Sequence, residues 1–163
     1  MSIRLAVRRL LCLLTGTVVA AGTALAAAPA APAAASYTPG AYAHRLLYDM
    51  NVARARYGLP PLRAVYGLTL VAGGWSYHMS RTHVLAHNPY LLAQANLRCV
   101  RWSTLGENVG YGSTSNPDAL FRAYWYSAAH RRNILNRSFR YVGVGVNYSG
   151  WAAWNTVDFA NLC

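Results

Sequence analysis

YVGVGVNYSGWAAWNTVDF, residues 141–159, decides the class of fold. Valines alternate with glycines from Val142 to Val146, and this period of two predicts a strand. Ser149-Gly150 predicts a turn, and Trp151 through Phe159 predicts a second strand. The two strands together predict an antiparallel hairpin late in the chain.

The residues before this hairpin carry helical patterns instead. Apolar side chains at three- and four-residue spacing predict a first helix after Pro39-Gly40, which Gly58 ends. A second helix is predicted from about Thr69 to Ala86, and a third opens at Asn116-Pro117-Asp118 and ends near Ser127. Helices first and a hairpin last indicate an α+β domain.

The first residues have the three parts of a secretory signal peptide. Three arginines precede an apolar run from Leu10 to about Ala26, which ends in the small-residue pattern Thr23-Ala24-Leu25-Ala26. We therefore predict a signal peptide at residues 1–26, an Ala/Pro-rich linker at 27–39 and one domain at 40–163, secreted to the extracellular space. A transmembrane anchor is the alternative for the apolar run.

The charge of the chain is strongly positive. All fifteen basic side chains are arginines, and the four acids are Asp49, Glu107, Asp118 and Asp158. Removal of the predicted signal peptide takes away three arginines and leaves twelve minus four, or +8. This charge favours anionic lipid head groups or an anionic cell-surface polymer as partners, and export argues against nucleic acid. A solvated surface that keeps the protein soluble is the alternative.

Two cysteines, Cys99 and Cys163, remain after the predicted cleavage. Two cysteines in an exported domain usually pair, so we predict a disulfide that ties residue 163 to the middle of the chain. Metal ligation is the alternative, although no Cys-x-x-Cys spacing supports it.

Glu107 is the only glutamate, and it lies in the glycine-bracketed segment LGENVGYG, residues 105–112. With His87 and His130 it offers two imidazoles and one carboxylate, which suit zinc or another divalent metal with a fourth position open for water. Each residue also has a structural interpretation: a helix-terminal cation for His87, an acceptor of amide hydrogen bonds for Glu107 and packing for His130. His83 and His87, four residues apart, are a competing ligand pair.

Ser127, three residues before His130, supplies a catalytic hypothesis. Glu107 behind the imidazole would complete a Ser-His-acid triad, and the amides of Gly110–Gly112 would offer an oxyanion hole. Nothing in the local sequence marks Ser127 as a strained nucleophile.

The longer motifs resemble the CAP superfamily of cysteine-rich secretory proteins, venom allergens and plant pathogenesis-related proteins, and most of all its bacterial secreted branch. The resemblance covers about residues 40–160. It is carried, in order, by Asn51-x-x-Arg54, Gly58-Leu59-x-Pro61-Leu62, Leu70-x-Ala72-x-x-Trp75-Ser76-x-x-Met79, Ala86-His87-Asn88-Pro89, Gly106-Glu107-Asn108-Val109, Ser127-x-x-His130-Arg131-x-Asn133-Ile134-Leu135, Val142-Gly143-Val144-Gly145 and Val157-Asp158-Phe159.

This resemblance implies a three-layer α-β-α sandwich with a small antiparallel sheet and a central cleft at His87, Glu107, Ser127 and His130. Many eukaryotic members carry Glu where this chain has Ser127, and bacterial relatives often have Ser. Some members bind zinc or another divalent ion, some bind sterols or fatty acids, and a few are reported as proteases. The resemblance therefore implies an extracellular binding module for lipid, sterol or another ligand, with a metal-dependent or Ser-His-Glu hydrolase as the alternative.

Overall fold

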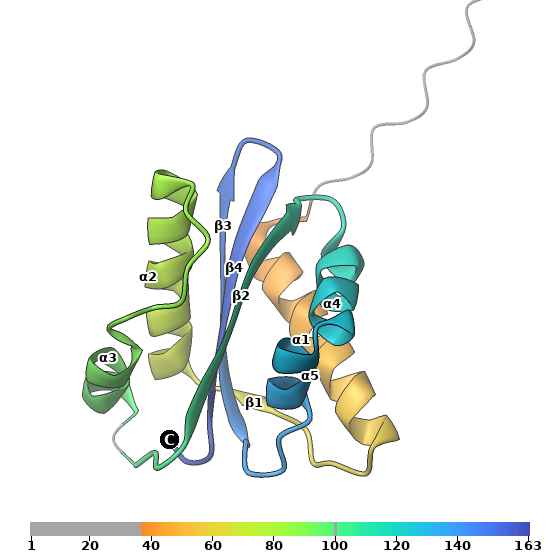
Figure 1. Cartoon of the computed structure of the whole chain (residues 1–163), viewed down its shortest axis with the longest axis vertical. Helices are drawn as coiled ribbons and strands as arrows, with labels where there is room; N and C mark the ends of the chain where they lie inside the picture. The colour runs from red at the N-terminus through yellow and green to blue at the C-terminus, as the bar shows by residue number, and fades with distance from the viewer. Residues whose placement is uncertain (1–36, 100) are drawn as a thin grey trace, which may run out of the picture. The chain divides into compact units, whose positions relative to one another are not determined.

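The computed structural model describes residues 37–99 and 101–163. Along this part of the chain the elements are α1 (Pro39–Arg56), β1 (Arg63–Ala64), α2 (Tyr66–Thr82), α3 (Leu91–Arg98), β2 (Leu105–Ser113), α4 (Pro117–Tyr126), α5 (Ala128–Ile134), β3 (Tyr141–Ser149) and β4 (Ala152–Ala160) (Figure 1). The predicted signal peptide and residues 27–36 of the predicted linker lie outside the described residues. None of the described helices has both the length and the apolar character that a membrane crossing requires.

The four strands form one sheet in the order β1-β3-β4-β2. The predicted hairpin is confirmed, because β3 and β4 pair antiparallel from Tyr141 opposite Ala160 to Ser149 opposite Ala152. Strand β2 also pairs antiparallel with β4, whereas the two residues of β1 run parallel to the start of β3. The sheet is therefore antiparallel in its three long strands and mixed only at this short edge.

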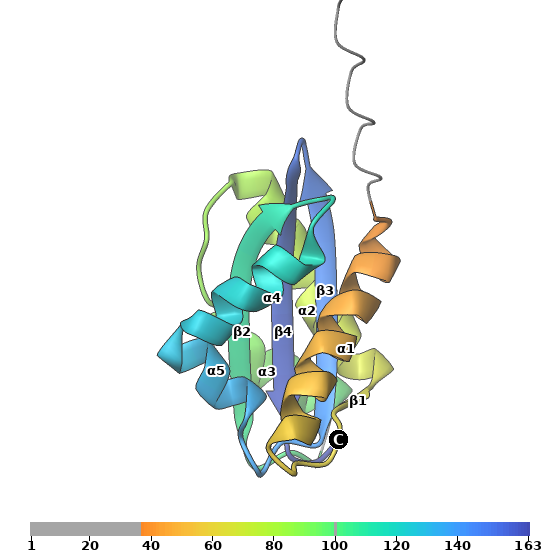
Figure 2. The same ribbon diagram turned by 90° about the vertical axis from the view of Figure 1, so that its right-hand side faces the viewer.

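Helices cover both faces of the sheet, which confirms the α+β class and the three-layer sandwich. Helices α2 and α3 lie on one face, and α1, α4 and α5 lie on the other (Figures 1 and 2). Strand β4 lies between β3 and β2, and all nine of its residues are buried. A strand covered on both faces buries nearly every side chain.

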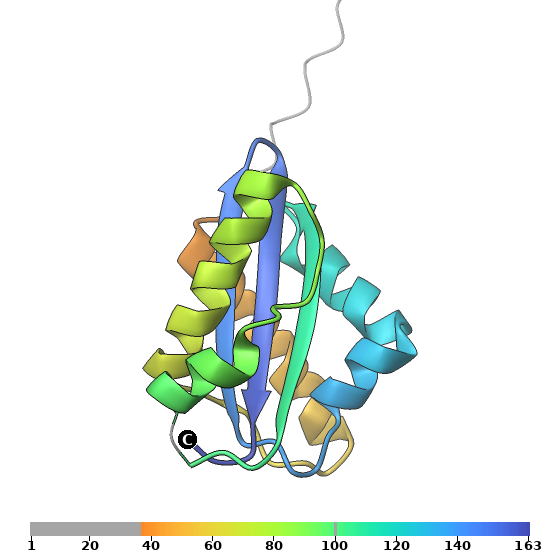
Figure 3. The ribbon, with the colours of Figure 1, turned by 60° about the vertical axis from the view of Figure 1, so that its left-hand side comes forward.

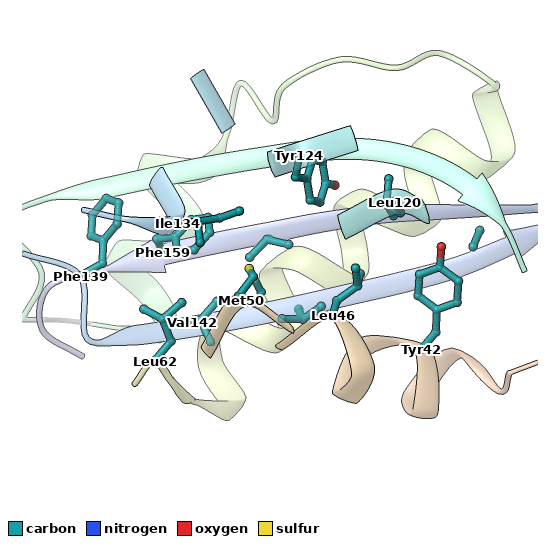
Figure 4. Close-up of a cluster of buried hydrophobic side chains, with 13 residues drawn as sticks. Tyr42, Leu46, Met50, Leu62, Leu120, Tyr124, Ile134, Phe139, Val142 and Phe159 are labelled. Atoms are coloured by element: carbon teal, nitrogen blue, oxygen red, sulfur yellow. The ribbon is translucent and has the colours of Figure 1, made fainter. Parts of the chain in front are cut away.

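The larger hydrophobic core lies between the sheet and the α1–α4 layer (Figure 4). Apolar residues at helical spacing on α1 and α4 meet the valines of β3 and the apolar residues of β4 there. The core residues are Tyr42, Leu46, Met50, Leu62, Leu120, Tyr124, Ile134, Phe139, Val142, Val144, Ala153, Val157 and Phe159.

The glycines of β3 bring α2 close to the other face. A Cβ on Gly143 would overlap the backbone of Leu68, and a Cβ on Gly145 would overlap the backbone of Ala72. Successive strand residues face opposite sides, so the valines fill the α1 side while the glycines leave room for the α2 backbone. The valine–glycine alternation therefore lets α2 approach β3 more closely than α1 does.

One predicted helix has other bounds in the structure, and further elements were not predicted. Helix α2 spans residues 66–82 rather than 69–86, and His83 caps it in a left-handed conformation with φ 55°. Strand β2 at residues 105–113, helix α3 and helix α5 from Ala128 were not predicted. At β2, pairing with the distant strand β4 overrode the local preference.

The predicted disulfide is confirmed, because Cys99 is bonded to Cys163 across 64 residues. It joins the residue that ends α3 to residue 163 beyond β4. The bridge therefore ties the α2–α3 layer to the central strand.

Candidate functional site

Glu107 lies on β2 with its side chain only 5% exposed, and its carboxylate holds the segment between α2 and α3. The Nδ1 atom of His87 lies 2.6 Å from Oε1 of Glu107, and the amide of Asn88 donates to the same oxygen at 3.0 Å. An ionised carboxylate can only accept, so we assign the hydrogen to Nδ1 of His87. The other ring nitrogen, Nε2, then faces away from Glu107 as an acceptor or ligand.

The segment that carries His87 is fastened on both sides of that residue. Trp75 Nε1 on α2 donates to the carbonyl of Ala86 at 2.8 Å, and Asn88 Nδ2 donates to Gln94 Oε1 on α3 at 3.0 Å. The connection from α2 to α3 consequently runs past β2 (Figure 3). These bonds fix the exposed imidazole, 65% of which is accessible, above the buried carboxylate.

His130 approaches from α5. Its carbonyl accepts from Asn108 Nδ2 at 3.1 Å, and its ring packs edge-on against Tyr124 with centroids 5.0 Å apart. Burial lowers the pKa of His130, and the nearby His87 lowers it further. This imidazole is therefore neutral at physiological pH, which is the form that can bind a metal.

The three predicted metal ligands do not form a three-ligand site. In the part of the chain that the structure describes, no three side chains among His, Cys, Asp and Glu lie close enough to share one metal ion. Oxygen Oε1 of Glu107 is engaged by His87 and Asn88, so Glu107 stands behind His87 as the partner that orients a ligating imidazole. The donor set left to a metal is two imidazoles with open positions.

The competing histidine, His83, has another environment. Its Nε2 lies 2.9 Å from Oγ of Ser149, and its ring lies 6.0 Å from Trp154 between centroids. Because α2 ends at Thr82, His83 and His87 do not share a helical face as the predicted longer helix implied.

The structure does not join the residues of the predicted triad by hydrogen bonds. Ser127 caps the start of α5, and no hydrogen bond among the described residues joins its Oγ to His130. The carboxylate of Glu107 is paired with His87 instead. Gly110 lies within β2 under α4, where a Cβ would meet the Tyr124 ring at 2.9 Å, so this glycine serves packing.

Sequence reasoning missed Asp158 as part of this site. Asp158 is fully buried on β4 directly opposite Glu107, and neither of its carboxyl oxygens has a hydrogen-bond partner among the described residues. Burial, and then the charge of Glu107, raise the pKa of Asp158 well above its usual range. Only the register between β2 and β4 would have revealed this pairing.

An apolar cavity of about 310 Å³, which neither His87 nor His130 lines, lies between α1 and α2 at the edge of β3. We call it the α1–α2 groove; it is lined by Pro39, Gly40, Ala43, His44, Leu47, Ala64, Thr69, Gly73, Val144, Gly145 and Val146. Four further cavities of 190 to 450 Å³ are also lined by residues other than His87, Glu107 and His130.

A model of the cysteine-rich secretory protein family, CAP, matches residues 47–157. The Bacillus subtilis protein YkwD is 29% identical over 116 residues, which are 68% of this chain and 44% of that protein. The structure of an extracellular protein containing an SCP domain from Bacillus anthracis has 26% identity and a TM-score of 0.66, covering 75% of this chain and 41% of the other. This chain thus spans less than half the length of both.

A third similarity concerns the fold alone. An outer surface protein from Borrelia burgdorferi has a TM-score of 0.69 at 13% identity, covering 80% of this chain and 99% of that protein. The B. anthracis and B. burgdorferi proteins are thus described as extracellular or as located on the outer surface.

Proposed function

Because the chain belongs to the CAP, or cysteine-rich secretory protein, family and resembles its bacterial members, we propose that it is a secreted binding module that holds the acyl chain of a lipid in the α1–α2 groove. Export is supported by the signal-peptide pattern of residues 1–26 and by the extracellular and outer-surface descriptions of two structural relatives. No Asp, Glu, Lys or Arg lines the groove, which suits an uncharged hydrocarbon chain.

The observation that carries the proposal is the open, apolar floor of the groove. Its volume of about 310 Å³ falls at the lower end of small-ligand sites, which are typically about 300–1,000 Å³. At Gly73, in the middle of α2, an added Cβ would meet nothing within 4 Å. Glycine inside a helix costs roughly 1 kcal/mol relative to alanine, so this glycine leaves space at a cost in stability.

The test uses a substitution that places a larger side chain in the groove. Gly73→Leu places a side chain in it, and Gly74→Leu adds the same side chain at the next helical position, which does not line the groove. We expect wild type and Gly74→Leu to bind a fluorescent fatty acid. Gly73→Leu should bind it at least about tenfold more weakly, because the new side chain displaces apolar contact equivalent to burying about one side chain. Equal binding by both variants, or no binding by wild type, would refute the groove as the lipid site.

We propose binding of a divalent metal by His87 and His130 as a second function. It is supported by the 2.6 Å contact between His87 and Glu107, which leaves Nε2 of His87 outward, and by the neutral state of His130. A zinc ion bound there would polarise a ligand oxygen as a Lewis acid. Two imidazoles are fewer protein ligands than zinc sites usually have, so we expect modest affinity.

A further inference from the structure

Arg54 of α1 is completely buried, and its charge is balanced by no carboxylate. Its guanidinium donates only to main-chain carbonyls: Pro60 at 2.9 Å, Ile134 at 2.7 Å, and Asn136 and Phe139 at 3.0 Å each. These bonds use four of its five donor hydrogens but leave a net positive charge within the protein. The Asn-x-x-Arg motif therefore places a fixed cation beneath the loops at this end of the sheet.

Two more guanidinium groups lie at the surface beside it. A cavity of about 280 Å³ is lined by Pro60, Pro61, Arg63, Arg140 and Tyr141. The carbonyls of Pro60 and Phe139 both accept hydrogen bonds from Arg54, and Phe139 precedes Arg140 in the chain. The amide of Arg63 on β1 donates to the carbonyl of Arg140 at 2.8 Å, which holds these two exposed arginines next to each other where β3 begins.

No acid of the chain neutralises this group. The chain has four acids, of which Asp49 and Asp118 pair with Arg45, Glu107 pairs with His87, and Asp158 is buried without a partner. Burial lowers the pKa of Arg54, and the positive charge of Arg140 lowers it further, so these two cations repel each other. An anion in the cavity would relieve that repulsion.

We propose that the cavity between Arg63 and Arg140 is a binding site for a phosphate or phosphodiester group. Arginine presents planar, paired donors that match phosphate oxygens, and phosphate accepts several charge-assisted hydrogen bonds at once. The side chain of Arg63 makes no hydrogen bond among the described residues, and Arg140 uses only Nη1, toward the carbonyls of Arg137 and Phe139. Most of their donors therefore have no partner among the described residues, and Tyr141 also lines the cavity.

The phosphate has two possible sources, and their chemistry is the same. Ala64, the neighbour of Arg63 on β1, lines the α1–α2 groove, so a lipid phosphate is one source. A soluble phosphate polymer of the cell surface is the other. The site does not depend on the lipid proposal, because inorganic phosphate carries no acyl chain.

The test is an NMR titration of the domain with inorganic phosphate at constant ionic strength in chloride. We expect saturable shifts confined to residues 60–63 and 139–141. Arg63→Gln should weaken binding about tenfold, the loss of a charge-assisted hydrogen bond. Arg122→Gln removes an equal charge from exposed α4, so it should bind like wild type. Since the Arg63 side chain is exposed and makes no hydrogen bond among the described residues, the amide spectrum of Arg63→Gln should otherwise match that of wild type.

Two results would overturn the proposal. One is the absence of saturable shifts in wild type, and the other is an equal loss in Arg122→Gln, which would mean diffuse attraction by net charge. Flotation with phosphatidylcholine vesicles, with or without phosphatidylglycerol, identifies the source. Binding that requires phosphatidylglycerol and Arg63 assigns the site to lipid head groups, and phosphate binding without vesicle binding assigns it to soluble phosphates.

Discussion

Glu107 and Asp158 lie directly opposite each other on β2 and β4, and both are buried. One carboxylate is bonded to His87 and Asn88, and the other has no hydrogen-bond partner in the part of the chain that the structure describes. Burial is the main reason that the pKa of Asp158 is raised, and the charge of Glu107 on the same face of the sheet adds to the cost of ionising it. Asp158 therefore stays protonated at pH values at which an exposed aspartate has lost its proton.

This relationship predicts how stability varies with pH. The pKa of Asp158 is raised in the folded state, so the folded state binds more protons than the unfolded state above about pH 4. Its contribution to stability is present below that pH and is lost as the pH rises through the folded pKa. Asp158→Asn should remove this slope and gain stability relative to wild type toward neutral pH, as urea unfolding at several pH values would show. Parallel pH curves for the two proteins would contradict it.

The proposed metal site at His87 and His130 predicts how substitutions change zinc affinity. Replacing the carboxylate that orients a ligating histidine typically costs about 10–100-fold in metal affinity, so Glu107→Gln should weaken zinc binding by that factor. His87→Ala/His130→Ala should abolish binding, and His44→Ala on α1 is the matched control. Titration calorimetry measures all four proteins. Unchanged affinity in the double variant would rule out this site.

The glycines of β3 predict a large packing effect. Gly143→Ala should destabilise the domain by about 3 kcal/mol, because the new Cβ overlaps the Leu68 backbone, which cannot move without shifting α2. Gly74→Ala is the control: its Cβ meets nothing, and in a helix it should stabilise by about 0.5–1 kcal/mol. Chemical denaturation distinguishes these opposite signs, and similar midpoints would contradict the close approach of α2.

The disulfide predicts sensitivity to reductant. A loop of 64 residues corresponds to roughly 4 kcal/mol in the chain-entropy model. Cys99→Ser/Cys163→Ser should lose about that much stability and become indifferent to reductant, whereas wild type should lose it only when reduced. Thermal unfolding with and without reductant measures both. A wild type unaffected by reductant would show that the bridge does not contribute.

The hairpin and the start of α4 were predictable because their signals are local. Alternating valines, Ser149-Gly150, and Asn116 with Pro117 each specify a conformation within a few residues. Strand β2 has no such signal, because its glycines interrupt the alternation. They are there for partners far away in the sequence: a Cβ on Gly106 would meet Phe139 at 2.8 Å.

The sequence singled out candidate site residues but not the pairing of His87 with Glu107. The motifs identified Glu107, His87 and His130, whereas the choice of His87 as the partner of Glu107 depends on where α2 stops and how Trp75 and Asn88 hold the next residues. The α1–α2 groove and the arginine cavity depend on how separate elements cross. No local pattern in the sequence encodes those crossings.

The position of β4 has a consequence for how the protein is made. Strands β2 and β3 do not pair with each other, since each uses β4 as its partner. During synthesis the helices and strands β1, β2 and β3 emerge before residues 152–160, so the three long strands cannot assemble until those residues follow. This dependence on a strand late in the sequence delays folding of the sheet until β4 is available.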